Sequence, residues 1–132
     1  MSNIQTIQEM YAAFGRGDVP AILGKLAEDV SWDADETPGV PWLKERVGRA
    51  NVAGFFESMA PLQYDAFEPH TFFEDGNKVF VLLRIDVTVK KSGEKYHFEN
   101  EGHLFEFNAA GQVARLQHVT DTAKWQAAAR GA

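Results

Sequence analysis

The chain has 132 residues, 45% of them hydrophobic, and it contains no cysteine. This length and composition predict a single domain over residues 1–132, with a core large enough to fold without a disulfide or a structural metal. The lack of cysteine excludes disulfides, thiolate metal sites and cysteine nucleophiles, and the net charge of -6 argues against binding to nucleic acid or to anionic membranes.

The sequence also lacks the marks of export and of nucleotide binding. The N-terminal stretch has no basic leader before an apolar core, and no segment approaches the roughly 20 apolar residues of a membrane span. Phosphate-binding glycine loops, dinucleotide fingerprints and the Gly-x-Ser-x-Gly turn of serine hydrolases are absent. We therefore expect a soluble, cytoplasmic protein that uses no cofactor.

The first part of the chain has the apolar spacing of helices. Four residues recur every three or four positions and share one helical face: Ile4, Ile7, Tyr11 and Phe14. Asp18 is placed to cap a second, short helix whose apolar side is predicted to reach Leu26. Gly15 and Gly17 lie between the two helices and predict a tight turn there.

A break in regular structure follows. Residues 30–34 alternate like a short strand, and residues 35–48 are predicted as a loop because Pro38 and Pro41 break regular structure. A third helix is predicted from Gly48 to just before Pro61, with its apolar residues again on one face.

After Pro61 the apolar spacing changes to every second residue. Strands are predicted near residues 63–74, 78–90, 95–108 and 112–120, separated by turns of Gly with Asn, Asp or Ser. Such short connections favour an antiparallel meander. A final helix is predicted over residues 121–129, so helices followed by hairpins predict the α+β class, with helices packed on a curved sheet.

The strand at 78–90 has one face without a polar residue, which must cover the core. Its other face alternates large apolar side chains with Arg84 and Asp86, a pattern that suits a subunit interface. Because two-fold dimers are the commonest oligomers, we expect a homodimer through this outer face.

The two later strands carry ionisable residues on the side expected to face inward. In the strand at 95–108 one face holds four of them: His97, Glu99, Glu101 and His103. In the last strand the set with Leu116 and His118 is the better inward set, because it lacks arginine. Burial of such groups is costly unless they have partners, so their placement calls for a reason.

Three stretches have the order and composition of a known family: YAAFGRGDVPAILGKLAEDVSWDAD, GRANVAGFFESM and HLFEFNAAGQVARLQHVTD. They resemble the SnoaL-like branch of the nuclear transport factor two superfamily, which includes ketosteroid isomerase and limonene epoxide hydrolase. The resemblance spans about residues 5 to 128 and implies a cone-shaped, barrel-like fold with a ligand cavity. It says less about function, because this fold carries isomerases, cyclases, hydrolases, dehydratases and binding proteins.

The catalytic residues of ketosteroid isomerase do not carry over onto this sequence. By the resemblance, its general base falls at Ala34, which Asp33 and Asp35 flank, its first-helix tyrosine falls at Met10, and its protonated aspartic acid falls at His103. We therefore do not expect the steroid isomerase reaction itself.

SnoaL-type cyclases use a histidine and an aspartate in the later strands as acid and base. That likeness implies His103 and His118 with Asp121 as candidates. Imidazole titrates near neutral pH, so we expect His118 to act as the general base. We expect His103 or Glu101 to donate a hydrogen bond to a developing enolate, and Asp121 to orient His118.

The resemblance also implies a set of cavity-lining residues. We expect eight ligand-binding side chains: Tyr11, Phe14, Trp32, Trp42, Phe56, Leu83, Ile85 and Leu116. Among them, Trp32 and Trp42 offer flat surfaces for a ring-bearing ligand, whereas Tyr11 is equally suited to ordinary helix packing.

Other interpretations stay open for the same residues. His118 is also compatible with a core histidine held by a backbone carbonyl, and Asp121 with the cap of the last helix. His103, His118 and Glu101 match the ligand set of a divalent metal, but paired ligands on one element are missing and no metal is expected.

The sequence thus predicts a cofactor-independent enzyme of the isomerase or cyclase type. Its partner would be a small hydrophobic molecule with a ring or a carbonyl group. The alternatives are a binding module that performs no chemistry and an assembly protein whose own side chains fill the cone.

Overall fold

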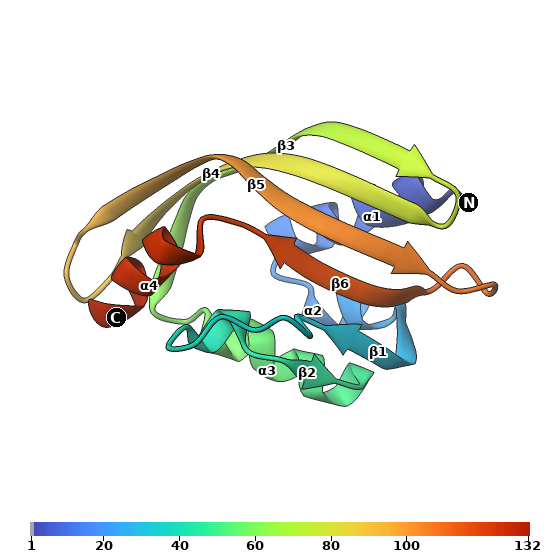
Figure 1. Cartoon of the computed structure of the whole chain (residues 1–132), viewed down its shortest axis with the longest axis horizontal. Coiled ribbons are helices and arrows are strands. Elements are labelled where there is room, and N and C mark those ends of the chain that lie inside the picture. Colours follow the sequence, from blue (N-terminus) through green and yellow to red (C-terminus); the bar gives the residue numbers. More distant parts are fainter. Residues whose placement is uncertain (1) are drawn as a thin grey trace.

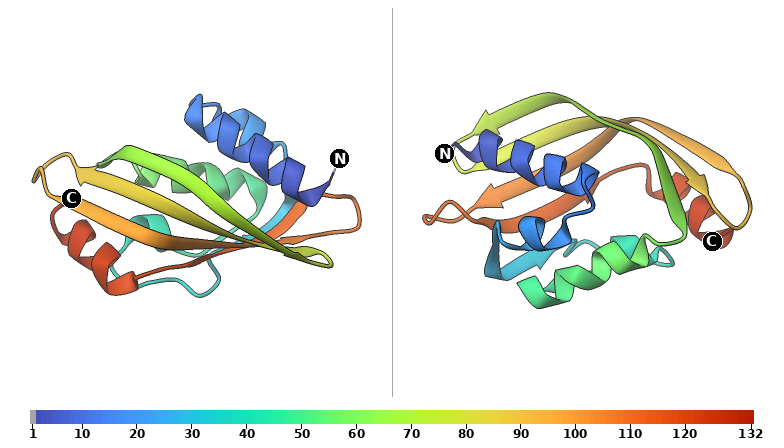
Figure 2. Two further views of the ribbon diagram at one scale, coloured as in Figure 1. Left: turned by 90° about the horizontal axis from the view of Figure 1, so that it is seen from above. Right: turned by 180° about the vertical axis from the view of Figure 1, so that it is seen from behind.

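The computed structural model describes residues 2–132, and it has a strongly bent sheet with helices packed on its inner side (Figure 1). Its elements follow in the order α1 (Asn3–Gly15), α2 (Val19–Leu23), β1 (Leu26–Trp32), the 3₁₀ helix η1 (Pro41–Leu43), β2 (Arg46–Val47), α3 (Arg49–Ser58), β3 (Leu62–Asp75), β4 (Lys78–Val89), β5 (Lys95–Phe107), β6 (Val113–Val119) and α4 (Thr122–Arg130). Figure 2 shows the N-terminal helices on one side of the sheet and α4 beside the β4–β5 turn. The expected α+β class with a cone-like sheet is confirmed.

Side-chain caps fix where the helices begin. Ser2 and Gln5 form the reciprocal hydrogen bonds of a capping box at the start of α1. Asp18 accepts a hydrogen bond from the third residue of α2 in the same manner. α2 ends before Leu26, which opens β1 and pairs with Val113 of β6. Its placement in the second helix was therefore wrong, because pairing with a distant strand overrides the local helical spacing.

The sheet contains six strands in the order β2-β1-β6-β5-β4-β3. Strands β3 to β6 form the expected antiparallel meander. β1 lies parallel to β6 and antiparallel to β2, so the sheet is mixed. The predicted loop at 35–48 contains η1 and β2, because Arg46 and Val47 pair with the end of β1.

The side chains of β5 change faces of the sheet in the middle of the strand. Its register against β4 shifts between Phe98 and Glu101, which marks a bulge. Before the bulge Phe98 is buried and His97 is exposed, and after it Glu101 and His103 are buried. The expectation that His97 and Glu99 share a face with the other two was therefore wrong, because the extra residue reverses the alternation.

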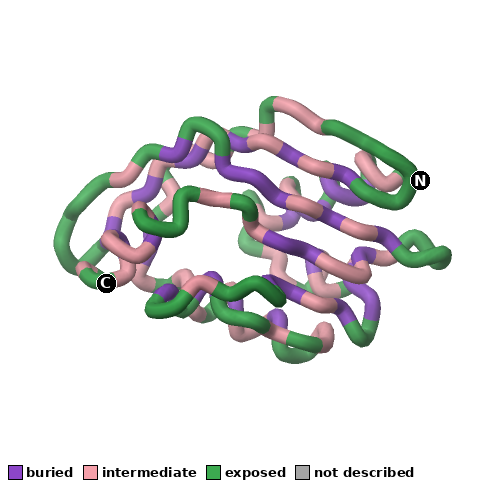
Figure 3. Tube along the Cα trace, in the orientation of Figure 1, coloured by how far each residue is buried: buried purple, intermediate pink, exposed green. Residues whose placement is uncertain are grey.

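The core lies between the inner sheet face and the helices, where buried and less buried residues alternate along the strands (Figure 3). The inward set of β4 is the one expected, and each member is at most 2% exposed: Val79, Val81, Leu83, Ile85, Val87 and Val89. Within residues 2–132 no helix is long and apolar enough to cross a membrane.

Candidate active site

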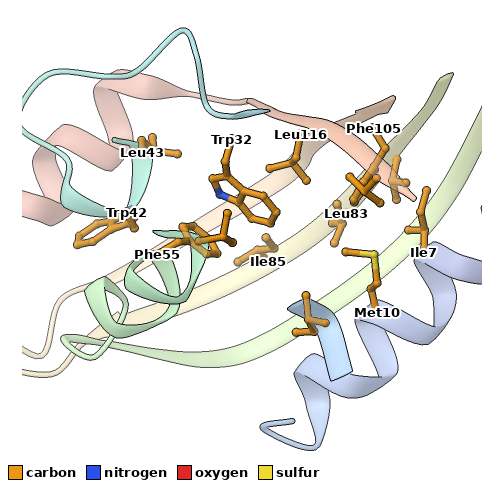
Figure 4. Packing of buried hydrophobic residues seen from close by; sticks show 14 of the residues in the cluster. Ile7, Met10, Trp32, Trp42, Leu43, Phe55, Leu83, Ile85, Phe105 and Leu116 are labelled. Atoms are coloured by element: carbon orange, nitrogen blue, oxygen red, sulfur yellow. The ribbon is translucent and has the colours of Figure 1, made fainter. Parts of the chain in front are cut away.

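A cavity that offers about 70 Å³ to the centres of water-sized molecules lies between the inner sheet face and helices α1 and α3. Seven of the residues expected to bind a ligand line it: Tyr11, Phe14, Trp32, Trp42, Phe56, Ile85 and Leu116. Leu83 does not line it and packs in the core instead. Figure 4 shows Trp32, Phe55 and Ile85, from three different elements, turned toward a common space.

Three ionisable residues from the two central strands join this apolar wall. His118 of β6 and Glu101 and His103 of β5 all line the cavity, as expected. His103 and His118 pair directly across the two strands, with 4.8 Å between their ring centroids and nearly perpendicular planes. In the described part of the chain, no group of three or more such side chains is arranged to hold a metal.

Asp33 holds His118 in place. The Nδ1 atom of His118 lies 2.9 Å from Oδ2 and 3.0 Å from Oδ1 of Asp33, and the backbone N–H of His118 donates to Oδ1. With Nδ1 directed at the carboxylate, Nε2 is the atom left to exchange a proton with a ligand.

The backbone at Asp33 is unusual. Its φ of 53° is the one positive value outside glycine in the described residues. Its N–H donates to the carbonyl of Leu116, and its side chain, 1% exposed, turns back to His118. The parallel pairing of β1 with β6 therefore brings two residues 85 positions apart into one pair.

The charge on Asp33 sets the titration of His118. Burial by itself lowers the pKa of His118, but the charge and hydrogen bond of Asp33, with the charge of Glu101, outweigh it. The pKa of His118 is therefore raised above its ordinary value, so the imidazole accepts a proton more readily than an isolated one.

His103 is in the opposite condition. Burial, and then repulsion from His118, hold the pKa of His103 well below its ordinary value, so the ring is neutral at pH 7. Its Nδ1 lies 2.9 Å from the hydroxyl of Tyr11, and burial raises the pKa of that phenol well above its ordinary value. When the protonated Tyr11 hydroxyl donates to Nδ1, the neutral ring of His103 carries its proton on Nε2 and can donate it in a hydrogen bond.

Glu101 is tied to the C-terminal helix. One carboxylate oxygen accepts a hydrogen bond from the Thr120 hydroxyl, and the other accepts one from Trp125 Nε1 at 3.1 Å. Burial raises its pKa, against the opposing effects of the His118 charge and of these hydrogen bonds. Because both oxygens have partners, Glu101 anchors α4 and is less free than His103 to contact a ligand.

Asp121 does not reach the site. It is exposed and accepts a hydrogen bond from the N–H of Lys124, so it caps α4, which was the alternative interpretation. The carboxylate that orients His118 is Asp33, which sequence reasoning noted only as a neighbour of Ala34. Its signal was its position directly after the first strand.

A comparison with protein families identifies the domain. The model of the SnoaL-like domain matches residues 7–116. The chain belongs to the SnoaL-like family. Among the curated proteins, no match is found.

Solved structures share this SnoaL-like fold over nearly their whole length. A nuclear transport factor two-like protein of unknown function from Burkholderia pseudomallei is 29% identical, with 93% of this chain and 94% of that chain covered and a TM-score of 0.80. TerC, co-crystallised with polyporic acid, is 21% identical, with 97% and 98% covered and a TM-score of 0.78. A protein of Xanthomonas campestris, provisionally named a polyketide cyclase, is 24% identical, with 96% of each chain covered and a TM-score of 0.73.

Proposed function

We propose that this SnoaL-like protein is a cofactor-independent enzyme that transfers a proton on a small hydrophobic molecule with a ring or a carbonyl group, in the manner of an isomerase or cyclase. One observation carries the proposal. Two histidines in contact within one apolar cavity have pKa values displaced in opposite directions. Opposite pKa displacements of two neighbouring groups are typical of a site in which one group accepts a proton and the other donates a hydrogen bond.

The roles follow from the hydrogen bonds. His118 would take a proton at Nε2 from a carbon beside a carbonyl, and Asp33 would stabilise the imidazolium that forms. His103 would donate from Nε2 to the oxygen of the developing enolate, with its tautomer fixed by Tyr11. The apolar wall strengthens both interactions because it keeps water away.

The relatives support the class of ligand. One neighbour is provisionally named a polyketide cyclase, and another was crystallised with polyporic acid. Both are consistent with a ligand in this fold that bears rings and carbonyl groups. The substrate of this chain is accordingly proposed by class alone.

Deuterium exchange tests the proposal without knowledge of the substrate. The probe is 2-tetralone, a small ring ketone with acidic protons beside its carbonyl, incubated with the protein in D₂O and followed by proton NMR. We expect the protein to accelerate exchange and His118→Ala to slow it by about 10²-fold or more. The matched control is His70→Ala, because His70 is exposed and contacts Thr71 on the outer part of β3.

Two outcomes would contradict the proposed enzymatic activity. If exchange is as fast in His118→Ala as in the parent, His118 is not the base. Binding of the ketone without any accelerated exchange would favour the alternative, a ligand-binding module of the same fold.

We also propose that a second copy of the chain packs on the outer sheet face. Phe80 and Leu82 of β4 are only partly buried there, beside ion pairs that join Arg84 to Glu68 and Glu99. Sedimentation velocity should show a dimer for the parent and a monomer for Leu82→Glu with unchanged circular dichroism. A monomeric parent would reject the dimer.

A further inference from the structure

Two hydrogen-bond donors in the cavity wall have no partner. The Nε1 atoms of Trp32 and Trp42 are enclosed and form no hydrogen bond in the part of the chain that the structure describes. Both side chains are 3% exposed, and both line the cavity. An indole nitrogen can only donate, and buried indoles usually find an acceptor, so two unpaired donors in one wall need an explanation.

The third tryptophan of the same wall shows the ordinary solution. Trp125 packs against Trp42 with 5.7 Å between ring centroids, and its Nε1 donates to Glu101 and to Thr120. The fold therefore supplies an acceptor to the indole that anchors α4. It supplies none to the two indoles on β1 and η1.

One of the two unpaired indoles lies close to the proposed catalytic pair. Trp32 directly precedes Asp33 in the chain, and its ring centroid lies 6.5 Å from that of His118. Its other ring neighbours are Phe55 and Phe56 of α3, at 5.1 and 6.4 Å. In Figure 4 the nitrogen-bearing edge of Trp32 lies on the side of Phe55 and Trp42.

A water molecule is a poor candidate for the missing acceptor. A buried water needs two to four polar partners, and the side chains around these indoles are mainly aromatic and aliphatic. A ligand oxygen needs only the donor, because the rest of the ligand fills the apolar space. An anionic oxygen is disfavoured by the carboxylate of Glu101, which lines the same cavity.

We propose that Trp32 and Trp42 are ligand-binding donors that select a flat ring compound bearing neutral carbonyl oxygens. This deepens the proposed function and rests on it only in using the same cavity. Because both nitrogen atoms are enclosed, ligand entry turns the aromatic side chains slightly apart and exposes the N–H groups. The indoles thereby hold the carbonyl oxygen to which His103 donates as the enolate develops, and they keep the acidic carbon in front of His118.

The experiment compares two probes of one shape. 2-Tetralone carries a carbonyl oxygen, and tetralin has the same ring skeleton without it. The chain has three tryptophans, so ¹⁵N-labelled protein gives three indole N–H signals. We expect the ketone to move the signals of Trp32 and Trp42 downfield, to leave that of Trp125 in place, and to bind about 3- to 10-fold more tightly than tetralin.

Substitutions then separate the N–H group from the ring. Trp32→Phe keeps an aromatic ring without a donor and should remove much of the preference for the ketone, and Trp42→Phe should do the same. Phe55→Leu is the matched control, because it alters the same wall but removes no hydrogen-bond donor, and it should weaken both probes alike.

The inference is overturned if the ketone moves neither indole signal, or if its preference survives both tryptophan substitutions. The parent protein alone decides the first point, so a poorly folded variant does not obscure the result. The outcome also differs from a failure of the proposed function. Indole shifts with exchange that does not depend on His118 would reject the enzyme alone, and His118-dependent exchange without indole shifts would reject this inference alone.

Discussion

Two histidine–carboxylate pairs in this protein are alike in geometry and opposite in surroundings. His118 Nδ1 lies 2.9 Å from Asp33, and their side chains are 11% and 1% exposed. His97 Nδ1 lies 2.6 Å from Asp86 on the outer face, and their side chains are 51% and 43% exposed. The shorter contact is thus the one in solvent, so contact distance does not identify the functional pair.

The surroundings decide what each pair can do. His97 also contacts Glu99, which pairs with Arg84, so its charge is shared across an open network that water and salt screen. Hydrogen bonds that the His97 ring donates to Asp86 and Glu99 raise the pKa of His97, and the ring's small burial opposes them only weakly. For His118 the same kind of attraction has to overcome a large cost of burial first. A change in the inner pair should therefore have much larger consequences.

Removing one carboxylate charge from each pair gives the largest predicted difference. Asp33→Asn leaves the imidazolium of His118 without its stabilising charge, so we expect exchange of 2-tetralone to slow by about 10²- to 10⁴-fold. Asp86→Asn, the matched control, should change the rate by less than about twofold, because it lies on the opposite face of the sheet. Equal losses in both variants would contradict the assignment.

Gly102 lies between Glu101 and His103, whose side chains face the cavity, and a Cβ on Gly102 would point at Phe80 on the outer face of the sheet. A Cβ there would come within 2.8 Å of a Phe80 ring carbon and of the Val119 carbonyl oxygen. We expect Gly102→Ala to lower the free energy of unfolding by about 1–3 kcal/mol in urea titrations, because backbone has to shift. Gly15→Ala is the control, since nothing lies within 4 Å of its added Cβ. If Gly102→Ala unfolds with the same free energy as the parent, the backbone of β5 and β6 shifts to accept the Cβ at little cost, and this prediction is wrong.

The pH dependence of stability should separate the two cavity histidines. Below pH 6.5 the unfolded chain protonates His103 and the folded protein does not, so His103 lowers the free energy of unfolding as pH falls, by at most about 1.4 kcal/mol per pH unit. His118 has a raised pKa and acts oppositely, since its contribution is lost as pH rises above 6.5 through the folded value. Urea titrations of the parent and of His103→Gln between pH 6.5 and 5 check the first statement. If the free energy of unfolding falls equally with pH in the two proteins, the prediction for His103 is wrong.

Much of the fold could be predicted from the sequence because its signals are local. Apolar spacing located the long strands to within about two residues, and the cap at Asp18 located the start of α2. The inward positions of His103 and His118 followed from alternation and from the family resemblance. These positions needed no knowledge of distant pairing.

The rest of the site depends on contacts between distant segments. Asp33 reaches His118 because β1 pairs with β6 and its own backbone turns at a positive φ, and neither feature has a local signal in a non-glycine residue. The bulge that sends His97 outward is equally invisible to a strict alternation of faces. The prediction of Asp121 as the orienting carboxylate is wrong, because Asp121 is near His118 in sequence but its side chain caps α4.

Added salt should have the smallest effect on the two histidine–carboxylate pairs, and it tests most directly whether one is exposed and the other enclosed. At an ionic strength near 1 M the Debye length is only about 3 Å, so exposed charges hardly interact beyond direct contact. We expect salt to move the pKa of His97 back toward its ordinary value by a fraction of a unit, and to leave the pKa of His118 almost unchanged because solvent ions do not enter its surroundings. Proton NMR titration of the histidine rings at low and high salt measures both in one sample. Equal salt shifts would mean that ions reach the inner pair, and the cavity would then be too wet for the charge separation that the proposed proton transfer requires.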